Sequence, residues 1–199
     1  MTNNTNNTNN TKYTYCLYNG QPQQMSILNL FDWRKYDIFK GVTYSTSKQF
    51  ILKYLFYYRK LDLIMGLPNY EVQKTIQDTF ENLNNYHKLA YKTPLNTDPK
   101  HDYLGAELHI LGRGVAHSKI YLLSNSQTQA KRVIIGSANL SLAALSTTKD
   151  QFEEIQVFDD PAKYNLYLKR YQEILNKTTG YMDRETKTYL RRLGYFKEN

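Results

Sequence analysis

Short apolar runs alternate with longer amphipathic stretches along the first half of the chain. Runs that end in glycine or polar residues predict strands at 25–31, 61–67 and 105–111. Apolar residues recur at helical spacing over 48–58 and from about 70 to 86, each time after hydroxyl or amide residues that can cap a helix. This alternation of strands and helices predicts an α/β layered fold with a substantially parallel sheet.

A strand predicted in the second half begins with two side chains suited to phosphate chemistry. His117 and Lys119 lie two residues apart in V-A-H-S-K-I-Y-L-L, where an apolar run begins. Because residues i and i+2 of a strand share a face, a strand here directs the imidazole and the ammonium to the same side. The turn predicted at Gly112 and Gly114 makes this strand a neighbour of 105–111.

The next apolar run, R-V-I-I, breaks at G-S-A-N (136–139). L-S-L-A-A-L then predicts a short helix, and the free N–H groups at a helix N-terminus favour an anion. A further strand is predicted at F-E-E-I-Q-V, which contains Glu153 and Glu154. Two strands therefore deliver a nucleophilic histidine, a cation and an anion-binding turn to one edge of the sheet.

These residues resemble the motif of the phospholipase D-like superfamily of phosphodiesterases. The family places His-x-Lys before Gly-Ser-x-Asn and an acidic residue, the order of H-S-K (117–119), G-S-A-N (136–139) and E-E (153–154) here. The resemblance implies a layered α/β/α sandwich with a mixed, largely parallel central sheet. The family's fuller pattern has an Asp where this chain has Ser124, and nuclease members such as metal-independent restriction endonucleases and helicase-associated nucleases often lack it. The departure favours the nuclease branch over the lipid-hydrolysing branch.

The resemblance and the chemistry of phosphodiesters together assign roles to the motif. An unperturbed imidazole is substantially neutral at pH 7, so His117 can attack phosphorus, and a second, protonated imidazole can give the leaving alkoxide its proton. Lys119 and Asn139 are expected to hold the non-bridging oxygens. Ser137 is expected to supply a hydroxyl, a backbone N–H or a helix cap.

The acidic residue of the motif is expected to orient the imidazole through its other ring nitrogen. Glu154 is preferred, because E-I-Q-V resembles the family's E-x-x-V strand, and Glu153 is the alternative. Family members need two His-x-Lys motifs, and this chain has one. The resemblance therefore implies a two-fold homodimer with both His117 side chains at its axis, unless the chain is a piece of a longer protein.

Composition indicates the class of binding partner and the cellular compartment to expect. The 199 residues carry a formal net charge of +8, which favours a polyanion, with DNA preferred, over the alternative of a solvated surface without a partner. Candidate phosphate contacts are Arg113 and, on a predicted basic helix, Lys187, Arg191 and Arg192. The one cysteine, Cys16, and the lack of a signal peptide or membrane-length apolar run favour a cytoplasmic location without membrane insertion.

The remaining features limit the function classes. Residues 1–12 form a Thr/Asn-rich tract predicted to be disordered, ahead of a single domain over 13–199. Neither a phosphate-binding glycine loop nor zinc-ligand spacing is present, so no cofactor or metal is expected, although scattered acids leave a magnesium-binding pair open. The sequence predicts a metal-independent phosphodiesterase, above all a nuclease that cleaves DNA through a phosphohistidine. The alternatives are a non-catalytic nucleic-acid-binding dimer and a phospholipid phosphodiesterase.

Overall fold

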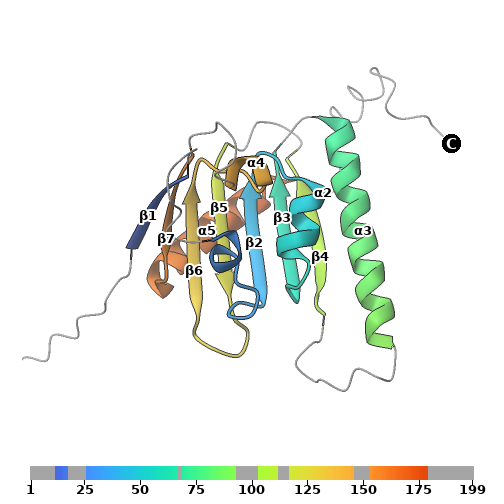
Figure 1. Cartoon of the computed structure of the whole chain (residues 1–199), viewed down its shortest axis with the longest axis horizontal. Helices are drawn as coiled ribbons and strands as arrows, with labels where there is room; N and C mark the ends of the chain where they lie inside the picture. Colours follow the sequence, from blue (N-terminus) through green and yellow to red (C-terminus); the bar gives the residue numbers. More distant parts are fainter. Residues whose placement is uncertain are drawn as a thin grey trace, which may run out of the picture.

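The computed structural model describes residues 12–17, 26–66, 69–92, 103–111, 117–145 and 153–178. Its strands form one mixed sheet in the order β1-β7-β6-β5-β2-β3-β4 (Figure 1). The strands are β1 (Lys12–Leu17), β2 (Ile38–Thr43), β3 (Lys60–Met65), β4 (Gly105–Ile110), β5 (Lys119–Ser124), β6 (Lys131–Gly136) and β7 (Glu153–Phe158). The helices are α1 (Ile27–Leu30), α2 (Lys48–Phe50), its π-helical continuation η1 (Ile51–Leu55), α3 (Tyr70–Lys92), α4 (Leu142–Leu145) and α5 (Pro161–Leu175).

The layered α/β architecture and the mixed sheet are confirmed, but the parallel share is smaller than predicted. Only β2 with β3 and β3 with β4 pair in parallel. The other four pairings are antiparallel. The expectation of a largely parallel sheet was wrong because β5 returns directly into β6, and neighbouring strands joined by a short turn run antiparallel. Parallel pairing is confined to the half of the sheet built by strand–helix–strand units.

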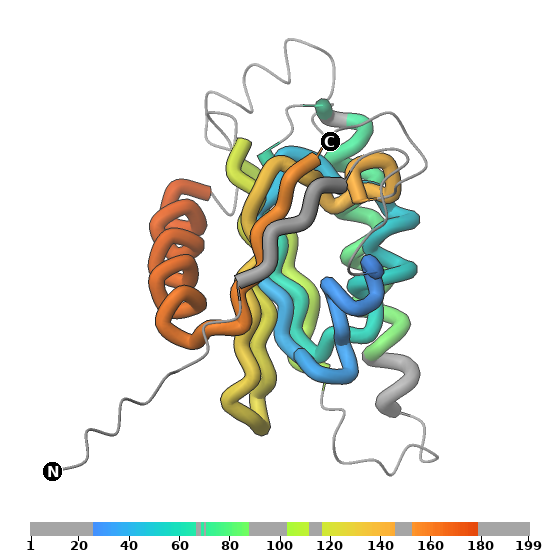
Figure 2. The backbone as a smooth tube through the Cα atoms, turned by 60° about the vertical axis from the view of Figure 1, so that its left-hand side comes forward, coloured from blue at the N-terminus to red at the C-terminus, as the bar shows by residue number. Residues whose placement is uncertain are grey.

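Helices cover both faces of the sheet, as the side view shows (Figure 2). Side chains of β5 alternate between the two faces of the sheet, so this strand contributes to both hydrophobic clusters. Tyr121 and Leu123 belong to the cluster under α1 and α2. Ile120 and Leu122 point the other way, into the cluster under α5. A strand with two apolar faces is therefore the centre of the fold, which is why I-Y-L-L is uninterrupted.

One predicted strand and one predicted strand neighbour were wrong. Within the predicted strand 25–31, the described residues 26–31 form no strand: Ile27–Leu30 are α1, and the Ser26 hydroxyl accepts the Asn29 N–H at 3.2 Å. The strand of this region is β2, which the hydrophobic pattern did not identify. β4 was expected beside the His117 strand, but β2 and β3 lie between β4 and β5.

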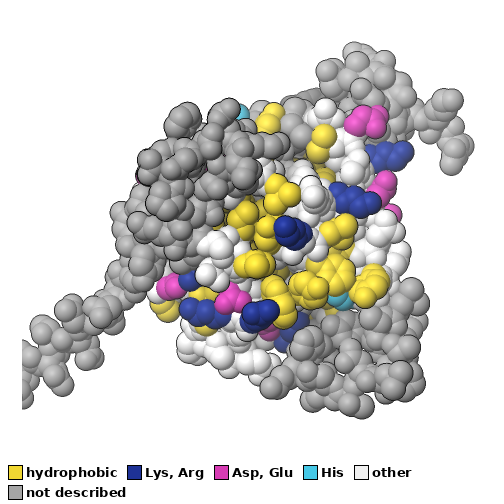
Figure 3. All heavy atoms as spheres, in the orientation of Figure 1, with side chains coloured by type: hydrophobic (Ala, Val, Ile, Leu, Met, Phe, Trp, Pro, Cys, Tyr) yellow, Lys and Arg dark blue, Asp and Glu magenta, His cyan; other side chains and the backbone are white. Residues whose placement is uncertain are grey.

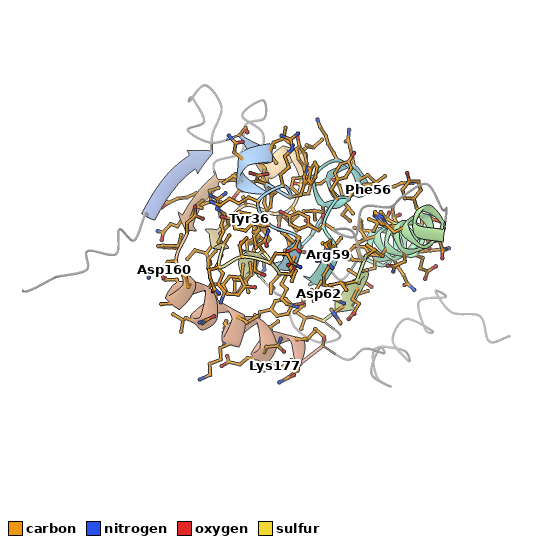
Figure 4. All side chains as sticks on the ribbon, turned by 90° about the horizontal axis from the view of Figure 1, so that it is seen from below. Tyr36, Phe56, Arg59, Asp62, Asp160 and Lys177 are labelled. Carbon is orange, nitrogen blue, oxygen red and sulfur yellow. The ribbon has the colours of Figure 1, made fainter. Side chains whose placement is uncertain are left out.

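The helix caps agree with the sequence. Ser47 caps α2 by accepting the Phe50 N–H at 3.2 Å, and Asn69 caps α3 by accepting the Val72 N–H at 3.2 Å. Asp160 caps α5 in the same way (Figure 4). Because α3 continues to Lys92, the connection predicted over 88–102 starts later than expected. The polar tract 1–11 and the predicted basic helix near the C-terminus lie outside the described residues.

The face covered by α1, η1 and α3 carries exposed hydrophobic side chains (Figure 3). Leu28, Leu52, Tyr57 and Tyr86 are among the exposed large side chains of the described residues. None of the described helices is both long enough and apolar enough to cross a bilayer.

An ion pair between a buried arginine and a half-buried aspartate joins three elements on this side of the sheet. Arg132 of β6, 5 % exposed, binds both carboxylate oxygens of Asp159 at 2.6 and 2.7 Å. Its third nitrogen donates to the carbonyl of Asn29 in α1 at 2.6 Å. Burial alone would raise the pKa of Asp159, but the hydrogen bonds and charge of Arg132, with Lys35 and Tyr36, outweigh it and lower that pKa. The pair therefore joins α1 to the turn between β7 and α5.

Replacing Asp159 by Asn should lower the free energy of unfolding by about 3 kcal/mol, because it removes the carboxylate charge that faces the buried Arg132 guanidinium. Glu173→Gln, which breaks the exposed Arg170–Glu173 pair, is the matched control and should cost less than about 0.5 kcal/mol. Urea unfolding measures both. Because the folded-state pKa of Asp159 is lowered, its contribution is present above the ordinary aspartate pKa and is lost as pH falls through the folded-state value. Equal effects of both variants at neutral pH would contradict this assignment.

Candidate active site

The predicted motif segments meet at one end of the sheet, where β5 starts and β2 and β6 finish. Lys119, the first residue of β5, pairs with Gly136, the last residue of β6, and Gly136 pairs in turn with Ile155 of β7. On the other side of β5, Ile120 pairs with Val42, so the end of β2 adjoins the same edge. The structure thus brings H-S-K, G-S-A-N and E-E together, with the β2 end as a fourth component.

His117 and Lys119 differ sharply in burial. The imidazole of His117 is exposed and lies just before β5, because the strand begins two residues later than V-A-H-S-K suggested. Lys119 is only 9 % exposed, and its Nζ donates to the His117 carbonyl oxygen at 2.7 Å. Burial lowers the pKa of Lys119, and the nearby negative charge of Glu153 partly offsets this shift. The ammonium is therefore fixed to the backbone of the residue that carries the accessible imidazole.

Gly136 is required by the close approach of β7. A Cβ at this position would lie 2.0 Å from the carbonyl oxygen of Glu154, far inside van der Waals contact. The Ser137 N–H donates to that same oxygen at 3.0 Å, and the Glu154 N–H donates to the Ser137 hydroxyl oxygen at 3.0 Å. The Ser137 hydroxyl in turn donates to the Glu153 carboxylate. Ser137 therefore fixes the loop to β7.

The amide of Asn139 is oriented by the segment after β2. Its Oδ1 lies 3.4 Å from the Ser45 backbone nitrogen and 3.3 Å from the Thr43 hydroxyl. Because a backbone N–H can only donate, the oxygen of the amide must face Ser45. Among the described residues, the amide nitrogen has no hydrogen-bond acceptor. That nitrogen is the group left to donate to a bound anion.

The residues after β2 were not predicted to belong to the site: the sequence suggested that T-Y-S-T-S (43–47) caps the following helix and lies ahead of the motif. The Thr46 hydroxyl donates to the Leu140 carbonyl at 2.8 Å, and the Tyr121 hydroxyl donates to the Ala138 carbonyl at 2.6 Å. Burial raises the pKa of Tyr121, so its phenol stays a donor. A run of hydroxyl residues directly after a buried strand was the signal in the sequence.

Strand register separates the two candidate acids. Tyr121 pairs with Ile134, and Ile134 pairs with Val157, so these side chains share a face with Lys119. Glu153, four residues before Val157, lies on that face, whereas Glu154 lies on the opposite face and is exposed. The geometry favours Glu153 over Glu154, the residue preferred from the sequence, as the acid of the site.

The remaining predicted residues lie elsewhere. Arg113, Lys187, Arg191 and Arg192 lie outside the described residues. Ser124, where the family pattern has an Asp, lies at the other end of β5 and is 3.1 Å from the Tyr164 hydroxyl of α5. Over the part of the chain that the structure describes, no three His, Cys, Asp or Glu side chains gather in a way that could hold a metal ion.

Comparisons with known proteins agree with this arrangement. A family model described as the NgoFVII restriction endonuclease N-terminal PLD domain matches residues 49–187. The fold is similar to NucT from Helicobacter pylori, with a TM-score of 0.56 and 15 % identity over 86 % of this chain and 99 % of that one. It is similar to the phospholipase D family member Nuc from Salmonella typhimurium, with a TM-score of 0.56 and 16 % identity over the same shares.

These two likenesses show the fold, and the search of curated proteins found no match. The family model covers well over half of the chain and includes H-S-K, G-S-A-N and E-E. The chain therefore belongs to the family of the NgoFVII restriction endonuclease N-terminal PLD domain, a nuclease branch of the phospholipase D-like superfamily.

Proposed function

We propose that the chain is a metal-independent nuclease that cleaves DNA through a phosphohistidine, in an active site shared by two subunits. The observation that carries the proposal is the convergence of His117, Lys119 and Asn139 at one edge of the sheet. An exposed imidazole, a buried ammonium and an amide N–H that has no acceptor among the described residues are the groups that attack on phosphorus needs. Membership of an endonuclease family supports the hydrolysis of phosphodiesters.

The reaction proceeds in two displacements. A neutral ring nitrogen of His117 attacks phosphorus, the N–P bond forms, and the P–O bond to the leaving nucleotide breaks. The leaving alkoxide takes a proton from a second, protonated imidazole. Water then attacks the same phosphorus, the N–P bond breaks, and the second imidazole takes the proton from that water. No electron transfer is involved, and both imidazoles return to their starting states.

Lys119 and Asn139 stabilise the negative charge that the non-bridging phosphate oxygens gain during each displacement. The Lys119 ammonium is fixed at the start of β5, and the Asn139 amide is fixed by Ser45. Both therefore need little reorganisation when the non-bridging oxygens gain charge. Glu153 is proposed as the acidic residue of the motif, not as the proton donor. It shares a face with Lys119, and its carboxylate accepts a hydrogen bond from the Ser137 hydroxyl.

The second imidazole is proposed to come from a second copy of the chain. Among the described residues, His87 lies in α3 with its Nε2 3.2 Å from the Phe56 carbonyl. His109 lies on β4, at the far edge of the sheet from β1 and on the face opposite Lys119. Neither can reach a phosphate held by Lys119. A two-fold dimer that joins two His117 side chains supplies both the nucleophile and the acid.

DNA is the proposed substrate because a polyanion complements the formal net charge of +8. Arg113, Lys187, Arg191 and Arg192 are proposed to contact phosphates. Such contacts would position the backbone without selecting a base sequence.

Cleavage of DNA should persist in excess EDTA, because no step of the proposed reaction uses a metal. His117→Ala should lower the rate by about 10³-fold or more while DNA binding remains, since the variant loses the nucleophile and not the basic surface. Agarose-gel cleavage and a filter-binding assay on the same samples measure the two properties. Activity that vanishes with EDTA and returns with Mg²⁺ would contradict the proposal. Binding without cleavage by the wild type would indicate a non-catalytic binding protein.

The paired variants Glu153→Gln and Glu154→Gln test which acid belongs to the site. The Glu153 charge raises the pKa of Lys119 against the effect of burial, so its removal should lower that pKa further. The ammonium would then be lost at lower pH, and the alkaline limb of the kcat profile of Glu153→Gln should move to lower pH. Glu154→Gln, on the opposite face, should leave this limb in place. A shift of the alkaline limb in Glu154→Gln but not in Glu153→Gln would identify Glu154 as the acidic residue of the site.

A further inference from the structure

An aromatic ring that the motif does not include lies against the nucleophile. The ring centres of Tyr44 and His117 are 5.2 Å apart, and the two planes differ by 5°. This is an offset stack, a favourable arrangement for two flat rings. Among the described residues, no hydrogen bond to the His117 ring nitrogens is present, so the Tyr44 ring is the described contact that sets the plane of this exposed imidazole.

The support beneath Tyr44 is fixed on both sides. Thr43 is fully buried, and its hydroxyl donates to the Ser45 carbonyl at 2.8 Å. Thr46 is 6 % exposed and forms both a backbone bridge and a side-chain hydrogen bond to Leu140. The backbone on both sides of Tyr44 is therefore held in place, in part by Leu140, the residue that follows the G-S-A-N loop.

The same ring also faces the cation of the motif. Lys119 Nζ lies 6.0 Å from the centre of the Tyr44 ring, at the outer limit of a cation–π contact. Both contacts involve the face of the ring, and neither uses the phenol hydroxyl. Tyr44 thus borders His117 and Lys119 at once.

We propose that Tyr44 is a positioning residue that holds the imidazole plane of His117, so that a ring nitrogen points at phosphorus. The proposal rests on His117 being the nucleophile. An exposed imidazole without this contact rotates among several orientations, and few of them aim a nitrogen at the substrate. Misplacement of a reacting group by about 1 Å can cost roughly 100-fold in rate. The ring, and not the hydroxyl, is the part required.

Three variants separate the ring from the hydroxyl. With bis(p-nitrophenyl) phosphate in EDTA, Tyr44→Leu should lower kcat by roughly 10- to 100-fold with KM nearly unchanged, because orientation and not binding is lost. Tyr44→Phe keeps the stack and should restore kcat to within about threefold of the wild type. Tyr57→Leu removes a tyrosine that is 54 % exposed near the start of β3, at the other end of the sheet, and is the matched control. Thermal unfolding of all three reports their folding.

A second readout does not depend on activity. The ring current of an aromatic face shifts the NMR signals of a stacked imidazole, so the carbon-bound protons of His117 should move in Tyr44→Leu and not in Tyr44→Phe. A folded Tyr44→Leu with wild-type kcat would overturn the positioning role, and so would a Tyr44→Phe as slow as Tyr44→Leu. If the wild type cleaves but His117→Ala cleaves equally well, the proposed function fails instead, and the ring-current shift still reports the stack.

Discussion

The carbonyl oxygen of Glu154 occupies the space where a side chain at position 136 would begin, and the rest of the site depends on this contact. A Cβ there would lie 2.0 Å from that oxygen, so only glycine allows β6 and β7 to approach so closely. The approach lets Ser137 bond to β7 through both its backbone N–H and its hydroxyl. The loop that follows is thereby directed towards the end of β2. A glycine required by packing thus determines where Asn139 is held.

The fold brings the site together from segments distant in sequence. Thr43 and Asn139 are 96 residues apart, yet their side chains are 3.3 Å apart because β2 and β6 flank the central strand β5. On the same face, the pair of buried Arg132 and half-buried Asp159 fixes α1 against the turn that follows β7. At the other end of β5, where Lys119 lies, Gly136 of β6 pairs with Lys119 on one side and Val42 of β2 pairs with Ile120 on the other. Such support is what the proposed phosphate site requires in order to be preorganised.

The sequence predicted the motif well and its surroundings less well, for identifiable physical reasons. The residues of H-S-K and G-S-A-N flank buried strands, and an uninterrupted apolar run such as I-Y-L-L is a strong local signal. Strand order is not local, so the placement of β4 beside β5 was wrong. The interpretation of 25–31 as a strand failed because four apolar-rich residues fit one helical turn equally well once Ser26 caps it. The proposal of Glu153 in place of Glu154 rests on the register with Gly136, which spacing alone does not provide.

The central claim is that two copies of His117 share one phosphate. Native mass spectrometry of the wild type, recorded without a denaturing quench during turnover of a DNA substrate in EDTA, tests it most directly. The account predicts a dimer that carries one covalently bound phosphoryl fragment, with peptide mapping that places it on His117 of one subunit. A monomer carrying the fragment, two fragments per dimer, or a fragment on any other residue would contradict the shared site.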